Sequence, residues 1–203
     1  MSEKSEQKSS TIEYYNKNAD AFVKRTVDID MLELYPKFTS LLPSGGKILD
    51  AGCGSGRDAR YFLSQGFEVV AIDASEEMVK SASNLTGQAA VQMRFEDMSF
   101  RNEFDGVWAS ASLLHIERSL LSDILATLIS SLRPKGHLYL SMRDGQGDEF
   151  IDGRYFSYIT ESELRHLLEQ RSDIELLELW TTSDRQPNRD LYKWINAVVI
   201  RSD

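Results

Sequence analysis

The spacing between apolar residues changes along the chain, and this change divides the sequence into parts with different predicted secondary structure. From Thr11 to about residue 42, apolar residues recur every three or four positions, which predicts two helices, the second interrupted by Pro36. Residues 1–10 carry no side chains that a core would bury, apart from Met1, and are expected to form a disordered tail. The helices are therefore expected to pack over a body that lies further along the chain.

From residue 47 onward, short apolar runs alternate with helical patterns. Strands are predicted over residues 47–51, 68–73, 91–95, 104–109 and 137–142, and helices over residues 57–65, 76–85 and 117–132. Parallel neighbours need crossover connections, so this alternation favours a parallel sheet with helices on both faces. The sequence thus predicts a doubly wound α/β domain.

The last third departs from this alternation. Thr160, with Glu163 three residues later, has the pattern of a capping box and predicts the start of a helix. Two strand-like runs follow, over residues 174–182 and 191–201, joined by a short polar loop that contains Pro187-Asn188. Such a loop cannot hold a crossover helix, so the two runs should pair antiparallel. The expected sheet is seven-stranded and mostly parallel, with an antiparallel C-terminal hairpin at its edge.

Length and charge limit the classes of protein that fit. With 203 residues, the expectation is one domain over residues 11–203, made of lid helices over 11–42 and a core over 47–203. The formal net charge of -9 opposes binding to bulk nucleic acid. No apolar run reaches the length of a membrane span, and no N-terminal segment has the pattern of a signal peptide.

Cysteine usage adds an expectation about the compartment. Cys53 is the single cysteine, so it cannot close an intrachain disulfide, and no Cys/His cluster has the spacing of a metal site. We therefore expect a cytoplasmic protein without a metal, present as a monomer or homodimer.

Three glycines, at positions 52, 54 and 56, mark the turn between the first predicted strand and the next helix. They allow the backbone to approach a small ligand closely. A dinucleotide fingerprint would need a third glycine at the position of Arg57, and a phosphate loop would need lysine there followed by Ser or Thr, so neither pattern is met. Asp50, two residues before the first glycine, would repel phosphate and attract an ammonium group.

Acidic residues also end the next two predicted strands. Asp73 lies at the end of the second strand, where a carboxylate can accept both hydroxyls of a ribose. The third strand ends at Glu96-Asp97-Met98, where an acid can bind an adenine amino group and the methionine can pack on the ring. Together with Asp50, these acids favour a nucleoside that carries a cationic amino-acid arm.

At these residues the chain resembles the Rossmann-like (class I) S-adenosylmethionine-dependent methyltransferases. The motifs that carry the resemblance follow in order from residue 48 to residue 142: Asp50-x-Gly52-x-Gly54-x-Gly56, Val69-Val70-Ala71-Ile72-Asp73-Ala74-Ser75, Glu96-Asp97-Met98, Phe104-Asp105-Gly106-Val107-Trp108 and Leu132-Arg133-Pro134-Lys135-Gly136-His137. The resemblance implies a Rossmann-like core and S-adenosyl-L-methionine as cofactor. It also agrees with the expected reversed edge strand.

The resemblance assigns cofactor contacts by position. The glycine loop with Asp50 would hold the methionine arm, Asp73 the ribose, and the strand ends the adenine and the sulfonium, while an N-terminal lid helix covers the site. The residues so implied are Tyr15, Arg25, Asp50, Ala51, Gly52, Gly54, Gly56, Asp73, Ala74, Met78, Asp97, Met98, Trp108, Ala109 and Ser110.

Some of these residues have simpler interpretations. Asp50 also suits a role as the cap of the following helix. His115 follows the fourth strand and is the candidate catalytic base, but a histidine among apolar neighbours more often forms a pocket wall. Arg143 and Arg154 bracket the loop after the fifth strand, and with Tyr155 they are candidates for binding an anionic substrate group.

The expected activity is methyl transfer by direct displacement to a small-molecule acceptor, with the segment over residues 144–156 as substrate lid. Such a reaction depends on positioning and needs no universal base. Methylation of RNA or protein is an alternative, disfavoured by the charge, by the absence of a Lys/Arg cluster and by the absence of an appended recognition domain. A non-catalytic S-adenosylmethionine-binding module remains a further alternative.

Overall fold

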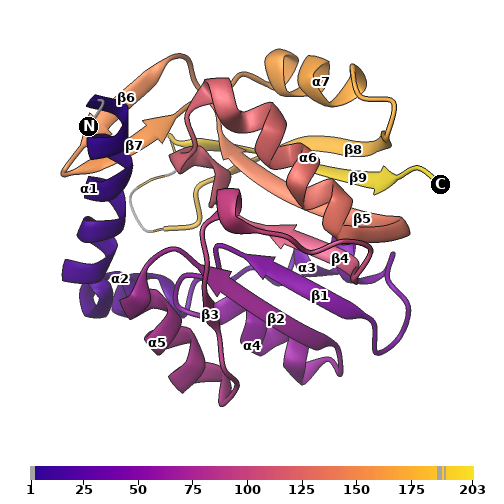
Figure 1. The fold of residues 1–203 in the computed structure, drawn as a ribbon, viewed down its shortest axis with the longest axis horizontal. Coiled ribbons are helices and arrows are strands. Elements are labelled where there is room, and N and C mark those ends of the chain that lie inside the picture. The colour runs from indigo at the N-terminus through magenta and orange to yellow at the C-terminus, as the bar shows by residue number, and fades with distance from the viewer. Residues whose placement is uncertain (1–2, 187–188, 190) are drawn as a thin grey trace.

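The computed structural model describes residues 3–186, 189 and 191–203, and a seven-stranded sheet lies at the centre of this part of the chain (Figure 1). The order of the strands is β3-β2-β1-β4-β5-β9-β8. They are β1 (Lys47–Ala51), β2 (Glu68–Asp73), β3 (Val91–Gln92), β4 (Phe104–Ala109), β5 (Leu132–Arg143), β8 (Ile174–Ser183) and β9 (Lys193–Arg201). Strands β1 to β5 are parallel, and β9 runs antiparallel to both β5 and β8. The predicted fold class is confirmed.

Helices cover both faces of the sheet. In Figure 1, α6 crosses in front of β4 and β5, while α3 and α4 lie behind the sheet. The helices are α1 (Glu3–Lys17), α2 (Ala19–Thr26), α3 (Tyr35–Thr39), α4 (Arg57–Ser64), α5 (Glu76–Thr86), α6 (Leu121–Ser131) and α7 (Glu161–Glu169). Short 3-10 turns span Phe95–Asp97, Leu113–His115 and Arg118–Leu120.

The alternation of side chains along the strands creates two cores. Leu49 and Val107 point to the face covered by α6 and α7. Their neighbours Ile48 and Trp108 point to the opposite face, where α3 and α4 pack. There Trp108 stacks on Tyr139 of β5 with ring centroids 3.8 Å apart. Because both faces are buried, the strands read as nearly continuous apolar runs in the sequence.

A separate hairpin and helix α1 stand together beside the main sheet. Strands β6 (Asp148–Ile151) and β7 (Arg154–Ser157) pair antiparallel, and α1 runs alongside them at the left of Figure 1. Two hydrogen bonds join α1 to this hairpin: Ser10 Oγ donates to Gly153 O, and Thr11 Oγ1 accepts from Tyr155 N. This pair covers the end of the sheet at which β1, β2 and β4 finish.

The hairpin was expected to be an irregular lid segment. Its turn is Asp152-Gly153, and both residues have positive φ, at 51° and 83°. An Asp-Gly pair between two apolar runs is a strong hairpin signal, which the sequence interpretation overlooked.

Several predicted bounds need correction. Helix α1 begins at Glu3, so residues 3–10 are helical and not a tail; glutamate, lysine and glutamine favour a helix even without a buried face. The third strand is limited to Val91–Gln92, and residues 95–97 form a 3-10 turn. Helix α6 begins at Leu121, after a 3-10 turn, and β5 already begins at Leu132.

Two predictions for the last third are confirmed. Thr160 and Glu163 form the capping box at the start of α7. The C-terminal hairpin is β8 with β9. The expected loop residues Pro187 and Asn188 lie outside the described residues. The division into a single domain stays a prediction.

Candidate active site

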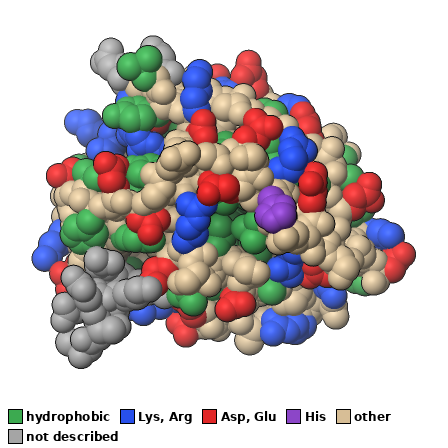
Figure 2. All heavy atoms as spheres, turned by 90° about the horizontal axis from the view of Figure 1, so that it is seen from above, with side chains coloured by type: hydrophobic (Ala, Val, Ile, Leu, Met, Phe, Trp, Pro, Cys, Tyr) green, Lys and Arg blue, Asp and Glu red, His purple; other side chains and the backbone are tan. Residues whose placement is uncertain are grey.

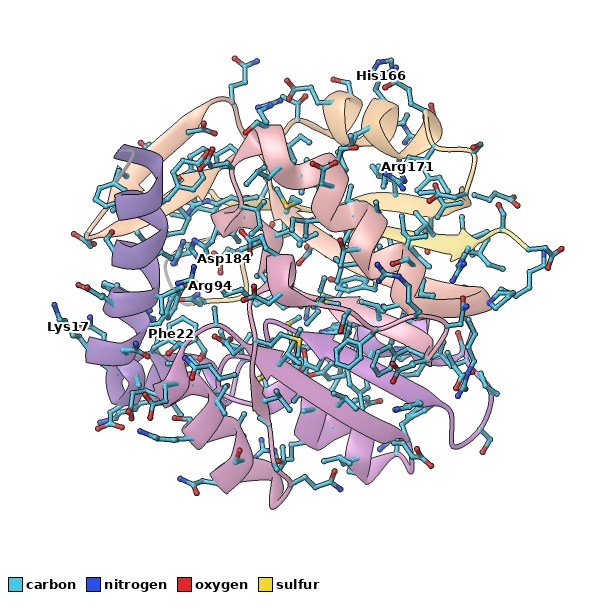
Figure 3. All side chains as sticks on the ribbon, viewed as in Figure 1. Lys17, Phe22, Arg94, His166, Arg171 and Asp184 are labelled. Atoms are coloured by element: carbon cyan, nitrogen blue, oxygen red, sulfur yellow. The ribbon has the colours of Figure 1, made fainter. Side chains whose placement is uncertain are left out.

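A cavity of about 900 Å³ opens at the carboxyl ends of β1, β2, β4 and β5, beneath α1, α2 and the β6–β7 hairpin. This volume falls within the range of about 300 to 1,000 Å³ that small-molecule sites typically have. Figure 3 shows three labelled wall residues from distant segments, Phe22, Arg94 and Asp184, gathered in the space between α1 and the sheet. Carboxyl ends of parallel strands are where α/β sheets bind ligands.

The loop between β1 and α4 forms one wall, and its shape depends on glycine. Gly52 has φ of +83°, and a Cβ atom there would overlap the side chain of Ser112. Gly56 has φ of +81°, and a Cβ atom there would lie 2.7 Å from Ala82 Cα on α5. A side chain at either position would be strained and would push the loop away from its neighbours.

Asp73, at the end of β2, holds this loop in place. Its Oδ2 accepts from Gly54 N–H at 2.9 Å, and its Oδ1 accepts from Ser75 N–H at 2.9 Å. Burial raises the pKa of Asp73, and these backbone hydrogen bonds oppose the rise. The backbone amide of Ala74 also contributes a hydrogen bond. A carboxylate offers roughly four acceptor positions, so about one remains for a ligand in the cavity.

Asp50 does not line the cavity. Its side chain is buried, and Oδ2 accepts from Ala59 N–H at 3.1 Å, in the first turn of α4. Burial and the negative charge of nearby Asp58 raise the pKa of Asp50, which weakens its attraction for a cation. The geometry supports the interpretation of Asp50 as a cap of α4 and brings no Asp50 side-chain atom to a ligand.

A buried carboxylate that the sequence analysis missed lies next to Asp50. Asp58 accepts from Arg57 Nε at 2.6 Å and Nη2 at 2.9 Å, from Tyr35 Oη at 2.7 Å and from Trp108 Nε1 at 2.9 Å. Burial alone would raise the pKa of Asp58, but the charge of Arg57 and the hydrogen bonds outweigh burial and lower it. We call these four residues the Asp58 cluster. Arg57 directly after the last glycine was the signal that could have revealed it.

Most of the sequence-predicted site residues come together at the cavity. Those that line it are Tyr15, Arg25, Gly52, Gly54, Asp73, Ala74, Met78, Ser110, His115, Arg143 and Arg154. They come from α1, α2, the glycine loop, the β2–α5 connection, α5, the segment after β4, the end of β5 and β7. Strand ends and covering elements thus converge as the resemblance implied.

The remaining predicted residues lie away from the cavity. Besides Asp50, they are Ala51, Gly56, Asp97, Met98, Trp108, Ala109 and Tyr155. Trp108 is fully buried against Tyr139 and Asp58, so its side chain does not face a ligand as expected. Met98 packs in the core, and Asp97 is exposed; the cavity-lining acid of that motif is Glu96.

His115 belongs to a hydrogen-bonded pair with Tyr15. His115 Nδ1 lies 2.6 Å from the carbonyl oxygen of Tyr155, and a carbonyl only accepts, so Nδ1 carries the proton. Nε2 then accepts from Tyr15 Oη at 2.8 Å. Burial lowers the pKa of His115 to about 4, aided by the charge of Arg154. The imidazole is therefore neutral near pH 7 and already has both nitrogens engaged.

Further cavity residues carried no sequence signal. They come mainly from α2, the segment before α3 and the β8–β9 end of the sheet: Phe22, Met31, Leu34, Ser141, Glu149, Tyr158, Arg185 and Arg189. Sequence reasoning missed these residues because they lie far apart along the chain and belong to no recognisable motif.

The fold and the cavity define an α/β domain with a cavity of small-molecule size at the ends of its parallel strands. Comparison with known proteins adds a family match over part of the chain. Residues 48–136 match the family described as "Methyltransferase domain". The ubiquinone biosynthesis O-methyltransferase of Xanthomonas axonopodis pv. citri is 32% identical over 108 residues, which cover 50% of this chain and 44% of that protein. The chain thus spans less than half the length of this curated relative.

Two solved structures share the fold over nearly the whole chain. The 1,6-didemethyltoxoflavin-N1-methyltransferase of Burkholderia thailandensis, solved with S-adenosylhomocysteine, has a TM-score of 0.77 at 24% identity and covers 97% of this chain and 87% of its own. The magnesium protoporphyrin IX methyltransferase of Synechocystis PCC 6803, also solved with S-adenosylhomocysteine, has a TM-score of 0.73 at 20% identity. The match covers 97% of this chain and 100% of that protein chain. Over residues 48–136 this chain matches a methyltransferase family, and over nearly its whole length it shares the fold of these two methyltransferases.

The depressed pKa of His115 predicts a pH-dependent stability. The unfolded chain binds a proton near pH 6.5, whereas the folded protein resists protonation until about pH 4, so the free energy of unfolding should fall as the pH decreases from 6.5 to 4. His115→Asn removes this contribution. Denaturant unfolding of both proteins across this pH range should show their stability difference shrinking at low pH. Parallel curves for wild type and variant would contradict the burial argument.

Proposed function

We propose that this protein binds S-adenosylmethionine in the cavity and transfers its methyl group to a small-molecule acceptor. The observation that carries the proposal is Asp73, a carboxylate that lines the cavity at the end of β2 and is hydrogen-bonded to the glycine loop at Gly54. When bound, S-adenosylmethionine supplies a methyl group on a positively charged sulfur, which is open to direct displacement.

The residues present fit this cofactor. Asp73 would accept the ribose hydroxyls, and Met78 with Ala74 would flank the adenine. The loop from Gly52 to Gly54 leaves its backbone open to the cavity for the methionine arm. Tyr15 and Arg25 line the wall above this loop and are the proposed contacts from the covering helices.

The other end of the cavity suits a small acceptor with an apolar body. Its walls include Phe156, and it is roofed by α1 and the β6–β7 hairpin. Such a roof excludes water and fixes the orientation of both reactants, which supplies much of the rate gain in a direct displacement. The Burkholderia and Xanthomonas proteins are also named for small-molecule methylation.

His115 serves in this proposal as a positioning residue and not as a base. Its Nε2 already accepts from Tyr15, and its pKa of about 4 leaves little driving force for taking a proton at neutral pH. Its contribution is to fix the hydroxyl of Tyr15, which lines the cavity, in one orientation.

The charge of the molecule disfavours the alternative of a nucleic-acid substrate. The formal net charge is -9, and acidic and basic side chains are interspersed over the face shown in Figure 2. Among the described residues, no helix is long and apolar enough to cross a membrane. The cytoplasmic location and the state as monomer or homodimer stay predictions.

The first test concerns the ribose contact. Asp73→Ala should weaken S-adenosylmethionine binding by about 1 to 3 kcal/mol, because it removes hydrogen bonds to a charged acceptor. Calorimetry on the folded variant measures the loss. Asp97→Ala is the matched control, since Asp97 is exposed and does not line the cavity. Equal affinity of wild type and Asp73→Ala would remove Asp73 from the site.

The second test concerns the reaction class. Purified protein is incubated with methyl-labelled S-adenosylmethionine and cell extract, and the extract is then separated into small-molecule, RNA and protein fractions. Label should enter the small-molecule fraction. Label in RNA or protein would replace the proposed acceptor class, and cofactor binding without any transfer would favour a binding module.

The third test separates a positioning role from a catalytic base at His115. His115→Asn keeps a donor for the Tyr155 carbonyl, so we expect altered substrate affinity and an unchanged shape of the pH profile of turnover. A base would instead lose roughly 10² to 10⁴ in rate and an ascending limb near the imidazole pKa. That second result, in a variant that still binds cofactor, would show our assignment of His115 to be wrong.

A further inference from the structure

Among the described residues, no carboxylate lies close to the guanidinium group of either of two arginines at the acceptor end of the cavity, since the nearest to Arg154 is 3.9 Å away. We propose, building on the proposed function, that the methyl acceptor carries an acidic group, a carboxylate or a phosphate, and that Arg143 and Arg154 bind this group. Arg143 ends β5 and Arg154 begins β7, so the sheet and the roof each contribute one guanidinium to the same cavity.

Three other arginines that line the cavity are paired with acids. Arg57 is paired with Asp58 at 2.6 Å and Arg185 with Glu33 at 2.6 Å. Arg189 Nε lies 3.2 Å from Asp184 Oδ2. Each of these arginines has its charge offset within the fold, so none of them requires a ligand.

Arg154 has no such close acid. Its side chain is 16% exposed, and its Nε atom is buried without a hydrogen-bond partner among the described residues. The nearest acid, Asp152, is 3.9 Å away and 76% exposed, so water screens the pair. Burying an unpaired donor of a charged group is costly unless a ligand completes it.

Aromatic rings, and not acids, hold both guanidinium groups. Arg154 Cζ lies 4.2 Å from the ring centroid of Tyr14 and 5.0 Å from that of Phe156. Arg143 Cζ lies 4.0 Å from the ring centroid of Tyr192. No carboxylate of the described chain lies within 4.0 Å of Arg143. Contact through the flat face leaves the edge donors free, and those donors bind carboxylate or phosphate in pairs.

The two arginines occupy neighbouring positions of one surface. Arg143 Cζ is 5.4 Å from the ring centroid of Tyr158, and the rings of Tyr158 and Phe156 are parallel with centroids 6.5 Å apart. Glu149 also lines the cavity, but its Oε2 accepts from Tyr158 Oη at 2.7 Å, and among the described residues no ion pair joins Glu149 to either arginine.

The test uses three flat probes that differ in charge: benzoate, phenyl phosphate and the neutral benzamide. Each is titrated by calorimetry into the protein, once saturated with S-adenosylhomocysteine and once without it. At least one anion should bind about tenfold more tightly than benzamide, since hydrogen bonds between charged partners exceed those of neutral ones. The better anion identifies carboxylate or phosphate as the preferred group.

Variants locate the site. The double variant Arg143→Gln with Arg154→Gln should bind both anions no better than benzamide, while its affinity for S-adenosylhomocysteine stays within about twofold of wild type. Arg60→Gln, which removes an equal charge at an exposed position of α4, is the matched control and should keep the anion preference.

Each outcome decides the inference. Equal affinity for anions and benzamide, no anion binding at all, or a preference that survives in the double variant would overturn it. Failure to bind S-adenosylhomocysteine would contradict the proposed function instead. The titration without S-adenosylhomocysteine still measures anion preference in that event, so the two failures remain distinguishable.

Discussion

The buried carboxylate of Asp58 is the interaction on which the site depends. It accepts four hydrogen bonds, from Arg57 on its own helix, Tyr35 on α3 and Trp108 on β4. Removing one partner of a buried charged pair typically costs about 3 to 5 kcal/mol, so these elements are joined by a constraint much stronger than one apolar contact. The constraint fixes the start of α4, and the glycine loop is the segment between that start and β1. The shape of the cofactor wall therefore follows from a group that does not need to touch the ligand.

Asp50 and Asp73 complete this arrangement from the two neighbouring strands. Asp50 binds the amide of Ala59 inside α4, and Asp73 binds the amide of Gly54 in the loop itself. Both carboxyls are buried, and burial raises the pKa of each. Their difference is access, since Asp73 lines the cavity and Asp50 does not. Asp50 thus only shapes the loop, while Asp73 shapes the loop and is also available to a ligand.

The sequence was sufficient for features that are local or periodic. The strand–helix alternation, the capping box at Thr160 and the glycine triplet each depend on residues a few positions apart, so pattern alone places them. The sequence was insufficient to predict the direction of a side chain where alternation along a strand decides which face of the sheet the residue occupies. Trp108 belongs to a motif that ends at the cavity, yet its side chain packs with Tyr139 on the other face. Tyr35 was likewise out of reach, because its hydrogen bond to Asp58 joins residues 23 positions apart and leaves no local period.

Helix α1 connects the two ends of the cavity, and its sequence explains how. Asn16 Oδ1 accepts from Ser75 Oγ beside the cofactor wall, while Tyr15, one position earlier, donates to His115. Thr11, one turn before Tyr15, accepts from the amide of Tyr155 in the β6–β7 hairpin, the hairpin that also carries Arg154. Residues 11 and 15 lie on one face of the helix, and residue 16 is turned by about 100° toward α5. A ligand at either end therefore contacts walls that the same helix holds in place.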